Sequence, residues 1–195
     1  MKKRIIVKAA ILSGALVLPG ILPVLMTLAE TETLSVCYNF NCKTRGEVQP
    51  TQADIEFFEK LFHNVTSAEE ERKNISFSIA NMEKISARYL PTGNDLGGNY
   101  TPDMPEEGKQ DCIDESTNTT TYLNYFQKHG WLHWHIVGER VHRAPYLFDD
   151  HWAAQILENK TGAIFVVDSW YRDNGQPAVI QSYEDWKNEQ DIDKQ

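Results

Sequence analysis

Positive charge is scarce in this chain. Lys and Arg together account for 19 of the 195 residues, against 28 Asp and Glu, and the formal net charge is −9. A protein that binds nucleic acid without sequence preference neutralises phosphates with a basic stripe, and the sequence contains no such stripe. We therefore expect no nucleic-acid partner.

Cysteine is also rare, with three in the whole chain. Cys37 and Cys42 enclose a loop short enough to close as a local disulfide in an oxidising compartment. That pairing leaves Cys112 without a disulfide partner. An odd cysteine in an exported protein forms an intermolecular link, is buried and inert, or is a reactive thiol.

Charge is absent from Ala9 to Ala29, a stretch in which Leu, Val, Ile and Ala dominate. Basic residues precede it, and Thr27 and Ala29 have the spacing that signal peptidases cleave, so residues 1–29 are interpreted as a signal peptide. An uncleaved N-terminal anchor is the alternative, since about 20 apolar residues span a bilayer. We expect a periplasmic or secreted bacterial protein, anchored in the inner membrane only if this segment is retained.

The remaining residues suffice for one domain with one core. Residues 30–50 are polar and are interpreted as an irregular arm that carries the disulfide. Residues 51–195 are interpreted as a single domain.

Apolar residues recur at helical spacing in the first half of that domain. The pattern predicts a helix over residues 51–63 and a long second helix that starts after Ser67 and ends near Pro91. A third helix is expected to start at Cys112 or Asp114, with Gly130 stopping it after His129. The apolar positions on which these helices depend are Ile55, Phe58, Leu61, Phe62, Ile75, Ile79, Met82, Ile85, Tyr89, Tyr122, Leu123 and Phe126.

Strand patterns dominate the second half. Residues 131–141 alternate apolar and polar side chains, residues 152–157 and 163–169 flank a turn, and residues 178–180 are expected to add an edge strand. Helices followed by antiparallel strands predict an α+β fold, with the N-terminal helices packed on the sheet.

The turn between the second and third strands allows a test of which residues face each other. If it centres between Asn159 and Lys160, His151 and Asp168 pair directly, with their side chains on one face about 5 Å apart. The carboxylate could then orient the imidazole and leave its other nitrogen free for a thiol proton. A slip of one residue would turn one side chain to the other face.

Cys112 supplies a nucleophile for such a pair. At a helix N-terminus, unpaired backbone N–H groups favour the thiolate and are natural donors to a developing oxyanion. Asp111, Asp114 and Glu115 oppose this effect unless they point outward or hold a cation.

The segments Asp111-Cys112-x-Asp114, His151-Trp152 and Val167-Asp168-Ser169 resemble the transglutaminase-like superfamily of the papain-type fold. Bacterial transglutaminase-like cysteine proteinases are the most similar. The resemblance covers roughly residues 105–170. It implies a transglutaminase/papain-like core with Cys112 as nucleophile, His151 as general base and Asp168 as its orienter. The chemistry would be thiol-dependent acyl transfer on a protein or peptide substrate, with hydrolysis favoured and no cofactor required.

Some members of that family bind calcium through acidic residues beside the cysteine. Asp111 and Asp114 are the candidates here. Ile113, Glu115 and Ser116 depart from the acidic and aromatic neighbours that are usual in the family.

Two other functions remain open. His133 and His135 are expected on one face of a strand, near His142, Asp149, Asp150 and His151, and such a set could hold the zinc of a hydrolase. A non-catalytic periplasmic binding or assembly module on the same fold is the other alternative.

Overall fold

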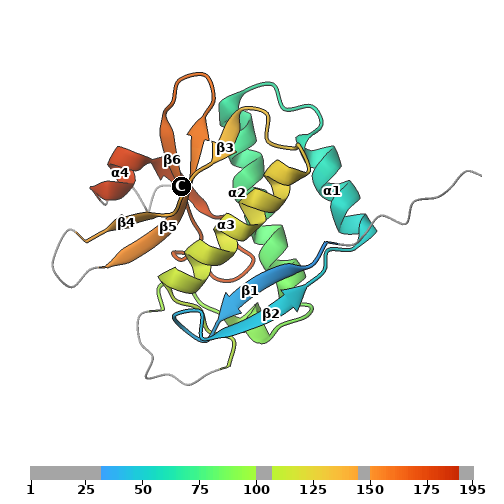
Figure 1. The fold of residues 1–195 in the computed structure, drawn as a ribbon, viewed down its shortest axis with the longest axis vertical. Helices are drawn as coiled ribbons and strands as arrows, with labels where there is room; N and C mark the ends of the chain where they lie inside the picture. The colour runs from blue at the N-terminus through green and yellow to red at the C-terminus, as the bar shows by residue number, and fades with distance from the viewer. Residues whose placement is uncertain (1–31, 100–106, 145–149, 189–195) are drawn as a thin grey trace, which may run out of the picture. The chain divides into compact units, whose positions relative to one another are not determined.

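A computed structural model describes residues 32–99, 107–144 and 150–188 of the chain (Figure 1). The expected signal peptide, residues 1–29, lies outside the described residues. Within the described part, no helix has the length and apolar character needed to cross a membrane.

The helices form largely where the apolar spacing predicts them. They are α1 (Gln52–Phe62), α2 (Ala68–Ser86), α3 (Cys112–Lys128), the short α4 (Tyr183–Lys187) and the 3-10 turn η1 (Pro91–Asn94). Ser67 caps α2 as expected, but the helix ends at Ser86 and not near Pro91. Tyr89 therefore lies beyond the helix, 47% exposed, and its hydroxyl donates to the carbonyl of Gln49 at 2.6 Å.

Gly130 ends α3 as predicted. Its φ of 72° is a left-handed conformation that costs glycine little. Its N–H donates to the carbonyl of Gln127 and that of Trp131 to Phe126, which satisfies the last carbonyls of the helix.

One antiparallel sheet holds most of the strands. Its order is β3 (His135–Val137), β5 (His151–Glu158), β6 (Ile164–Asp168) and β7 (Val179–Ser182), with β4 (Val141–Arg143) also paired to β5. The three C-terminal strands were predicted, including the position of β7 at the edge.

The single strand expected over residues 131–141 is wrong. β3 pairs with the end of β5 and β4 with its start, so the segment is split in two. Before β3, the N–H groups of His133 and Trp134 donate to the buried carboxylate of Glu71 and do not join a sheet.

The described part of the predicted arm, residues 32–50, is not irregular, which corrects the prediction. β1 (Leu34–Tyr38) and β2 (Thr44–Val48) form an antiparallel hairpin closed by the Cys37–Cys42 disulfide, which confirms that pairing. The alternation of apolar residues explains the difference, because Leu34, Val36 and Val48 are buried in the core.

The hairpin turn is unusual, because Asn39, Phe40, Asn41 and Cys42 all have positive φ angles, from 52° to 69°. A left-handed conformation costs a non-glycine residue about 1–2 kcal/mol. Such a turn persists only where surrounding contacts over-determine it.

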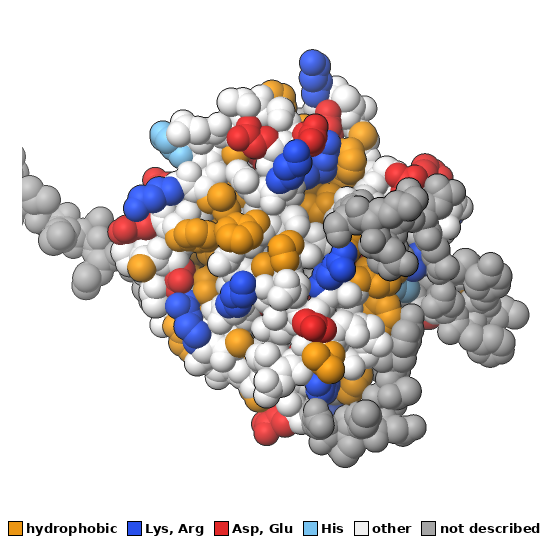
Figure 2. All heavy atoms as spheres, turned by 180° about the vertical axis from the view of Figure 1, so that it is seen from behind, with side chains coloured by type: hydrophobic (Ala, Val, Ile, Leu, Met, Phe, Trp, Pro, Cys, Tyr) orange, Lys and Arg blue, Asp and Glu red, His pale blue; other side chains and the backbone are white. Residues whose placement is uncertain are grey.

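α3 lies at the centre of the domain, between the sheet and the β1–β2 hairpin (Figure 1). Tyr122, Leu123 and Phe126 of α3 pack with Ile75, Ile79 and Met82 of α2 and with Ala154 and Ile156 of β5, as the apolar spacing predicted. The α+β class is therefore confirmed. On the face seen in Figure 2, Lys and Arg side chains are scattered among hydrophobic ones and form no single basic stripe.

Candidate thiol site

Cys112 is the first residue of α3, at the position that the sequence predicted, and its side chain is partly exposed. Its sulfur lies 3.9 Å from the backbone carbonyl oxygen of Asp150, which directly precedes β5. The helix start is built by Asp111, whose carboxylate accepts the N–H groups of Ile113 at 3.0 Å and Asp114 at 2.9 Å. These two donors are therefore engaged by Asp111.

His151 and Asp168 meet, but not in the predicted register. The pairs Ala154↔Val167 and Leu157↔Ile164 place the centre of the turn one residue later, between Lys160 and Thr161. His151 and Asp168 are thus diagonal neighbours. The shift moves each partner by two residues, so both side chains keep the same face, and His151 Nε2 lies 2.7 Å from Asp168 Oδ2.

The side chain of Cys112 also interacts with the imidazole of His151 and helps to raise its pKa. Since Nε2 is engaged by Asp168, Nδ1 is the nitrogen left for the thiol. Burial lowers the pKa of His151, but the hydrogen bonds and charges of Asp168 and Cys112 outweigh it and raise the pKa to about 9. The structure therefore brings the three predicted residues together and favours an imidazolium beside the sulfur.

Asp168 is held by a second donor that the sequence did not reveal. The indole Nε1 of Trp186, in α4, donates to the same Oδ2 atom at 2.8 Å. The rings of Trp170 and Trp186 lie 4.7 Å and 5.8 Å from that of His151. Trp186 is only 1% exposed, so the His151–Asp168 hydrogen bond is shielded from water.

Arg143 is a further neighbour that sequence reasoning missed. Arg143 pairs with His151 in the β4–β5 ladder. Its guanidinium donates to Tyr171 Oη at 2.6 Å and to the carbonyl of Trp186. The same group lies over the Trp186 ring. The β3–β4 break hid this contact, because a continuous strand over residues 131–141 would have ended before Arg143.

Buried carboxyl groups lie beneath the thiol site. Glu115 is 4% exposed and accepts the hydroxyl of Ser169 at 2.5 Å. Burial, together with the charges of Asp95, Asp114 and Asp168, raises the pKa of Glu115 to about 8, although the Ser169 hydrogen bond opposes this. Burial is also the main cause that raises the pKa of Asp95 to about 6. At neutral pH Glu115 is therefore mostly protonated and adds little negative charge near Cys112.

The two predicted calcium ligands cap the start of α3. Asp111 Oδ2 accepts the N–H of Asn41 at 2.9 Å, while Asp114 accepts the N–H groups of Cys42 at 2.7 Å and Asp111 at 3.2 Å. Burial and the charge of Asp111 raise the pKa of Asp114 to about 7. All four carboxylate oxygens of the pair thus accept backbone donors, and calcium binding stays a prediction.

The expected His133 and His135 pair does not share a strand face. His133 precedes β3 and is exposed, whereas His135 is 1% exposed. Both ring nitrogens of His135 have protein partners, Nδ1 with Glu71 at 2.9 Å and Nε2 with Arg72 at 3.2 Å. His142 and Asp150 contact each other, and Asp149 lies outside the described residues. The described members of this set therefore form no open three-ligand zinc site.

Among the described residues, one triad of side chains is grouped closely enough to hold a metal, namely Cys37, Cys42 and Asp114. Its two sulfurs form the disulfide. The two sulfurs are therefore bonded to each other and are not thiolate ligands for a metal ion in this structure.

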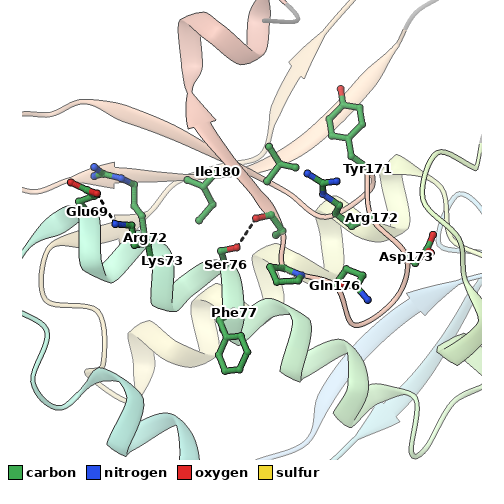
Figure 3. Close-up of a pocket in the computed structure, with 13 residues that line it drawn as sticks. Glu69, Arg72, Lys73, Ser76, Phe77, Tyr171, Arg172, Asp173, Gln176 and Ile180 are labelled. Atoms are coloured by element: carbon green, nitrogen blue, oxygen red, sulfur yellow. Dashed lines mark hydrogen bonds and ion pairs between the residues drawn. The ribbon is translucent and has the colours of Figure 1, made fainter. Parts of the chain in front are cut away.

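A cavity of about 920 Å³ lies between α2 and β7 (Figure 3). Ser76 donates to the carbonyl of Ala178 at 2.7 Å across it, and Arg72, Lys73 and Arg172 contribute positive charge to its lining. The lining does not include the thiol, but Tyr171 borders both places, since its ring is 5.4 Å from that of His151.

Comparison of this chain with protein-family models, curated proteins and solved structures finds no match.

Proposed function

We propose that the chain is a thiol-dependent acyl-transfer enzyme, a cysteine peptidase or amidase, with Cys112, His151 and Asp168 as its triad. One observation carries the proposal. The buried imidazole of His151 is hydrogen-bonded to Asp168 and interacts with the side chain of Cys112, which begins a helix and helps to raise the pKa of the imidazole. A nucleophile, a base and a group that orients the base are the parts that covalent acyl transfer needs.

Each residue has a distinct role in the proposed reaction. The Cys112 thiolate attacks an amide carbonyl carbon, and the resulting oxyanion needs a donor. Since Asp111 engages the N–H groups of Ile113 and Asp114, the N–H of Cys112 itself is the helix donor assigned to this oxyanion. His151 then gives its proton to the leaving amine, and water hydrolyses the thioester with His151 as base.

The arrangement of elements supports a transglutaminase/papain-like core. The cysteine begins the central helix α3, and the histidine and aspartate come from the adjacent antiparallel strands β5 and β6. Protein or peptide is the proposed substrate class, with no cofactor needed and calcium an accessory at most.

The disulfide supports an exported location. Cys37–Cys42 is an intact disulfide, and such bonds persist in oxidising compartments such as the periplasm. We infer that the protein works in the periplasm or outside the cell, and that it contacts a membrane only if the N-terminal segment is retained.

The pH dependence of alkylation tests the proposal. Cys112 is the one cysteine outside the disulfide, so iodoacetamide without reductant reports on it alone. We expect rapid labelling well below pH 8 in the wild type and ordinary thiol behaviour in His151→Ala, with Cys112→Ser as the blank. Hydrolysis of a fluorescent casein should disappear in both variants.

A wild-type protein whose labelling follows the profile of a free cysteine would overturn the catalytic proposal. The protein would then be better described as a non-catalytic binding module on the same fold.

A further inference from the structure

The tip of the β1–β2 hairpin lies beside the N-terminus of α3 (Figure 1). It contacts the residues on both sides of Cys112. The N–H of Asn41 donates to Asp111 Oδ2 at 2.9 Å, and that of Cys42 to Asp114 Oδ1 at 2.7 Å. The hairpin therefore holds the residue before the nucleophile and the residue two positions after it.

The same turn also holds the chain that leads into α3. Asn39 donates its N–H to the carbonyl of Lys109 at 2.7 Å, and its side chain accepts the N–H of Gly108 at 2.9 Å. These contacts depend on the left-handed backbone of residues 39–42, because it turns successive N–H groups toward one side.

Cys37 anchors the other end of the turn to α3. Asn118 accepts the N–H of Cys37 at 2.7 Å and donates to its carbonyl at 2.8 Å, and the buried Gln110 donates to that carbonyl at 3.1 Å. The disulfide joins this fixed point to Cys42, where the strained turn ends. The disulfide therefore closes the turn covalently. Without it, these non-glycine residues would relax out of the left-handed conformation.

We propose that the Cys37–Cys42 disulfide is a positioning element for the nucleophile, so that its oxidation state sets the reactivity of Cys112. This inference rests on the function proposed above. With the disulfide open, residues 39–42 leave the left-handed region, and Asp111 and Asp114 lose the N–H donors of Asn41 and Cys42. The first turn of α3 then loses its alignment with His151.

Reduction converts the disulfide into two thiols by taking up two electrons and two protons. A phosphine supplies the electrons and becomes its oxide, and water supplies the oxygen and the protons. Reductants, which usually activate thiol enzymes, are therefore expected to inactivate this one.

The test compares iodoacetamide labelling of Cys112 in the wild type and in the double variant Cys37→Ser/Cys42→Ser, where it is the sole cysteine. We expect the labelling rate at about pH 6.5 to fall about 10- to 100-fold and its pH profile to approach that of a free thiol. Circular dichroism and cooperative unfolding should show that the domain stays folded.

Adding Asn41→Gly to the double variant provides a rescue. Asn41 is exposed and contributes its backbone N–H, and glycine adopts positive φ without strain. Part of the lost reactivity should return. Should the double variant fail to fold, phosphine treatment of the folded wild type gives the same comparison, with alkylation of the two newly formed thiols, Cys37 and Cys42, distinguished from that of Cys112 by mass.

The outcomes separate the two proposals. A wild type with ordinary thiol behaviour overturns the catalytic function. An activated wild type with an equally activated, folded double variant overturns the positioning role alone. If both the double variant and the reduced wild type unfold, the disulfide stabilises the whole fold and does not specifically position Cys112. This outcome also overturns the positioning role.

Discussion

His151 Nε2 lies 2.7 Å from Asp168 Oδ2, although the two residues are not register partners in the β5–β6 hairpin. They meet diagonally, and the indole of Trp186 donates to the same oxygen. The carboxylate therefore orients the imidazole while a buried aromatic residue orients the carboxylate. This relationship leads to the first two of five predictions.

Asp168→Asn should lower the pKa of His151. The hydrogen bond and negative charge of Asp168 are main causes of the raised value of about 9, and the amide keeps an acceptor oxygen but loses the charge. The imidazolium should then lose its proton at lower pH and stabilise the Cys112 thiolate less, so labelling of Cys112 below pH 7 should slow. Histidine ring NMR titration measures this, and an unchanged His151 titration would contradict the assigned pair.

Trp186→Phe should destabilise the domain by about 1.5–3 kcal/mol, the usual worth of a hydrogen bond to a charged group. Phenylalanine keeps the ring against His151 but removes the N–H that Asp168 accepts. Urea denaturation of the two proteins gives the difference. Tyr183→Phe, on the same short helix, is the matched control and should change stability far less.

Glu115→Gln should make the stability of the domain depend less on pH as the pH rises into the alkaline range. The folded pKa of Glu115, about 8, lies above its ordinary value of 4.5, so its contribution is full below about pH 4.5 and is lost as the pH rises through 8. The amide cannot ionise. Thermal unfolding at about pH 6 and pH 9 should show a smaller difference in Tm for the variant than for the wild type.

Glu59→Gln is the control for that comparison, because Glu59 is an exposed carboxylate in α1. Its pH dependence should match that of the wild type. An equal effect of both substitutions would show that net charge, and not the buried group, governs alkaline stability.

Glu71→Gln should cost about 3–5 kcal/mol, as expected when one partner of a buried charged network is removed. The carboxylate accepts the N–H groups of His133, Trp134 and His135 and contacts the His135 ring. An amide would place its own N–H against these donors. Chemical denaturation measures the loss; a cost below about 1 kcal/mol would show that this network is dispensable.

Calcium should have little effect on the protein. Asp111 and Asp114 already accept five backbone N–H contacts, and each carboxylate serves the start of α3. We expect the same Tm and the same Cys112 labelling rate with millimolar calcium and with chelator. A calcium-dependent rise in Tm that Asp111→Asn abolishes would instead support the predicted site.

Local patterns predicted much of the fold. The apolar spacing of Phe58, Ile75 and Phe126 identified the three long helices, and Gly130 marked the end of α3. These features depend on neighbours within a turn or two, so the chain alone carries them. The hairpin of β1 and β2 was missed because its alternation is short and its turn contains no glycine to mark the left-handed backbone.

The sequence by itself determined which chemistry is available: an unpaired thiol at a helix start, an imidazole and a carboxylate on neighbouring strands, and a disulfide loop upstream. It also predicted that His151 and Asp168 share a face, and the prediction held because the observed register differs from the expected one by two residues, which preserves the pleat. Only the tertiary structure decided their diagonal contact and the Trp186 donor. It also decided how the hairpin holds Asp111 and Asp114 around Cys112. These contacts join residues that are 17 to 72 positions apart in the sequence. They are determined by long-range packing, which no local sequence pattern encodes.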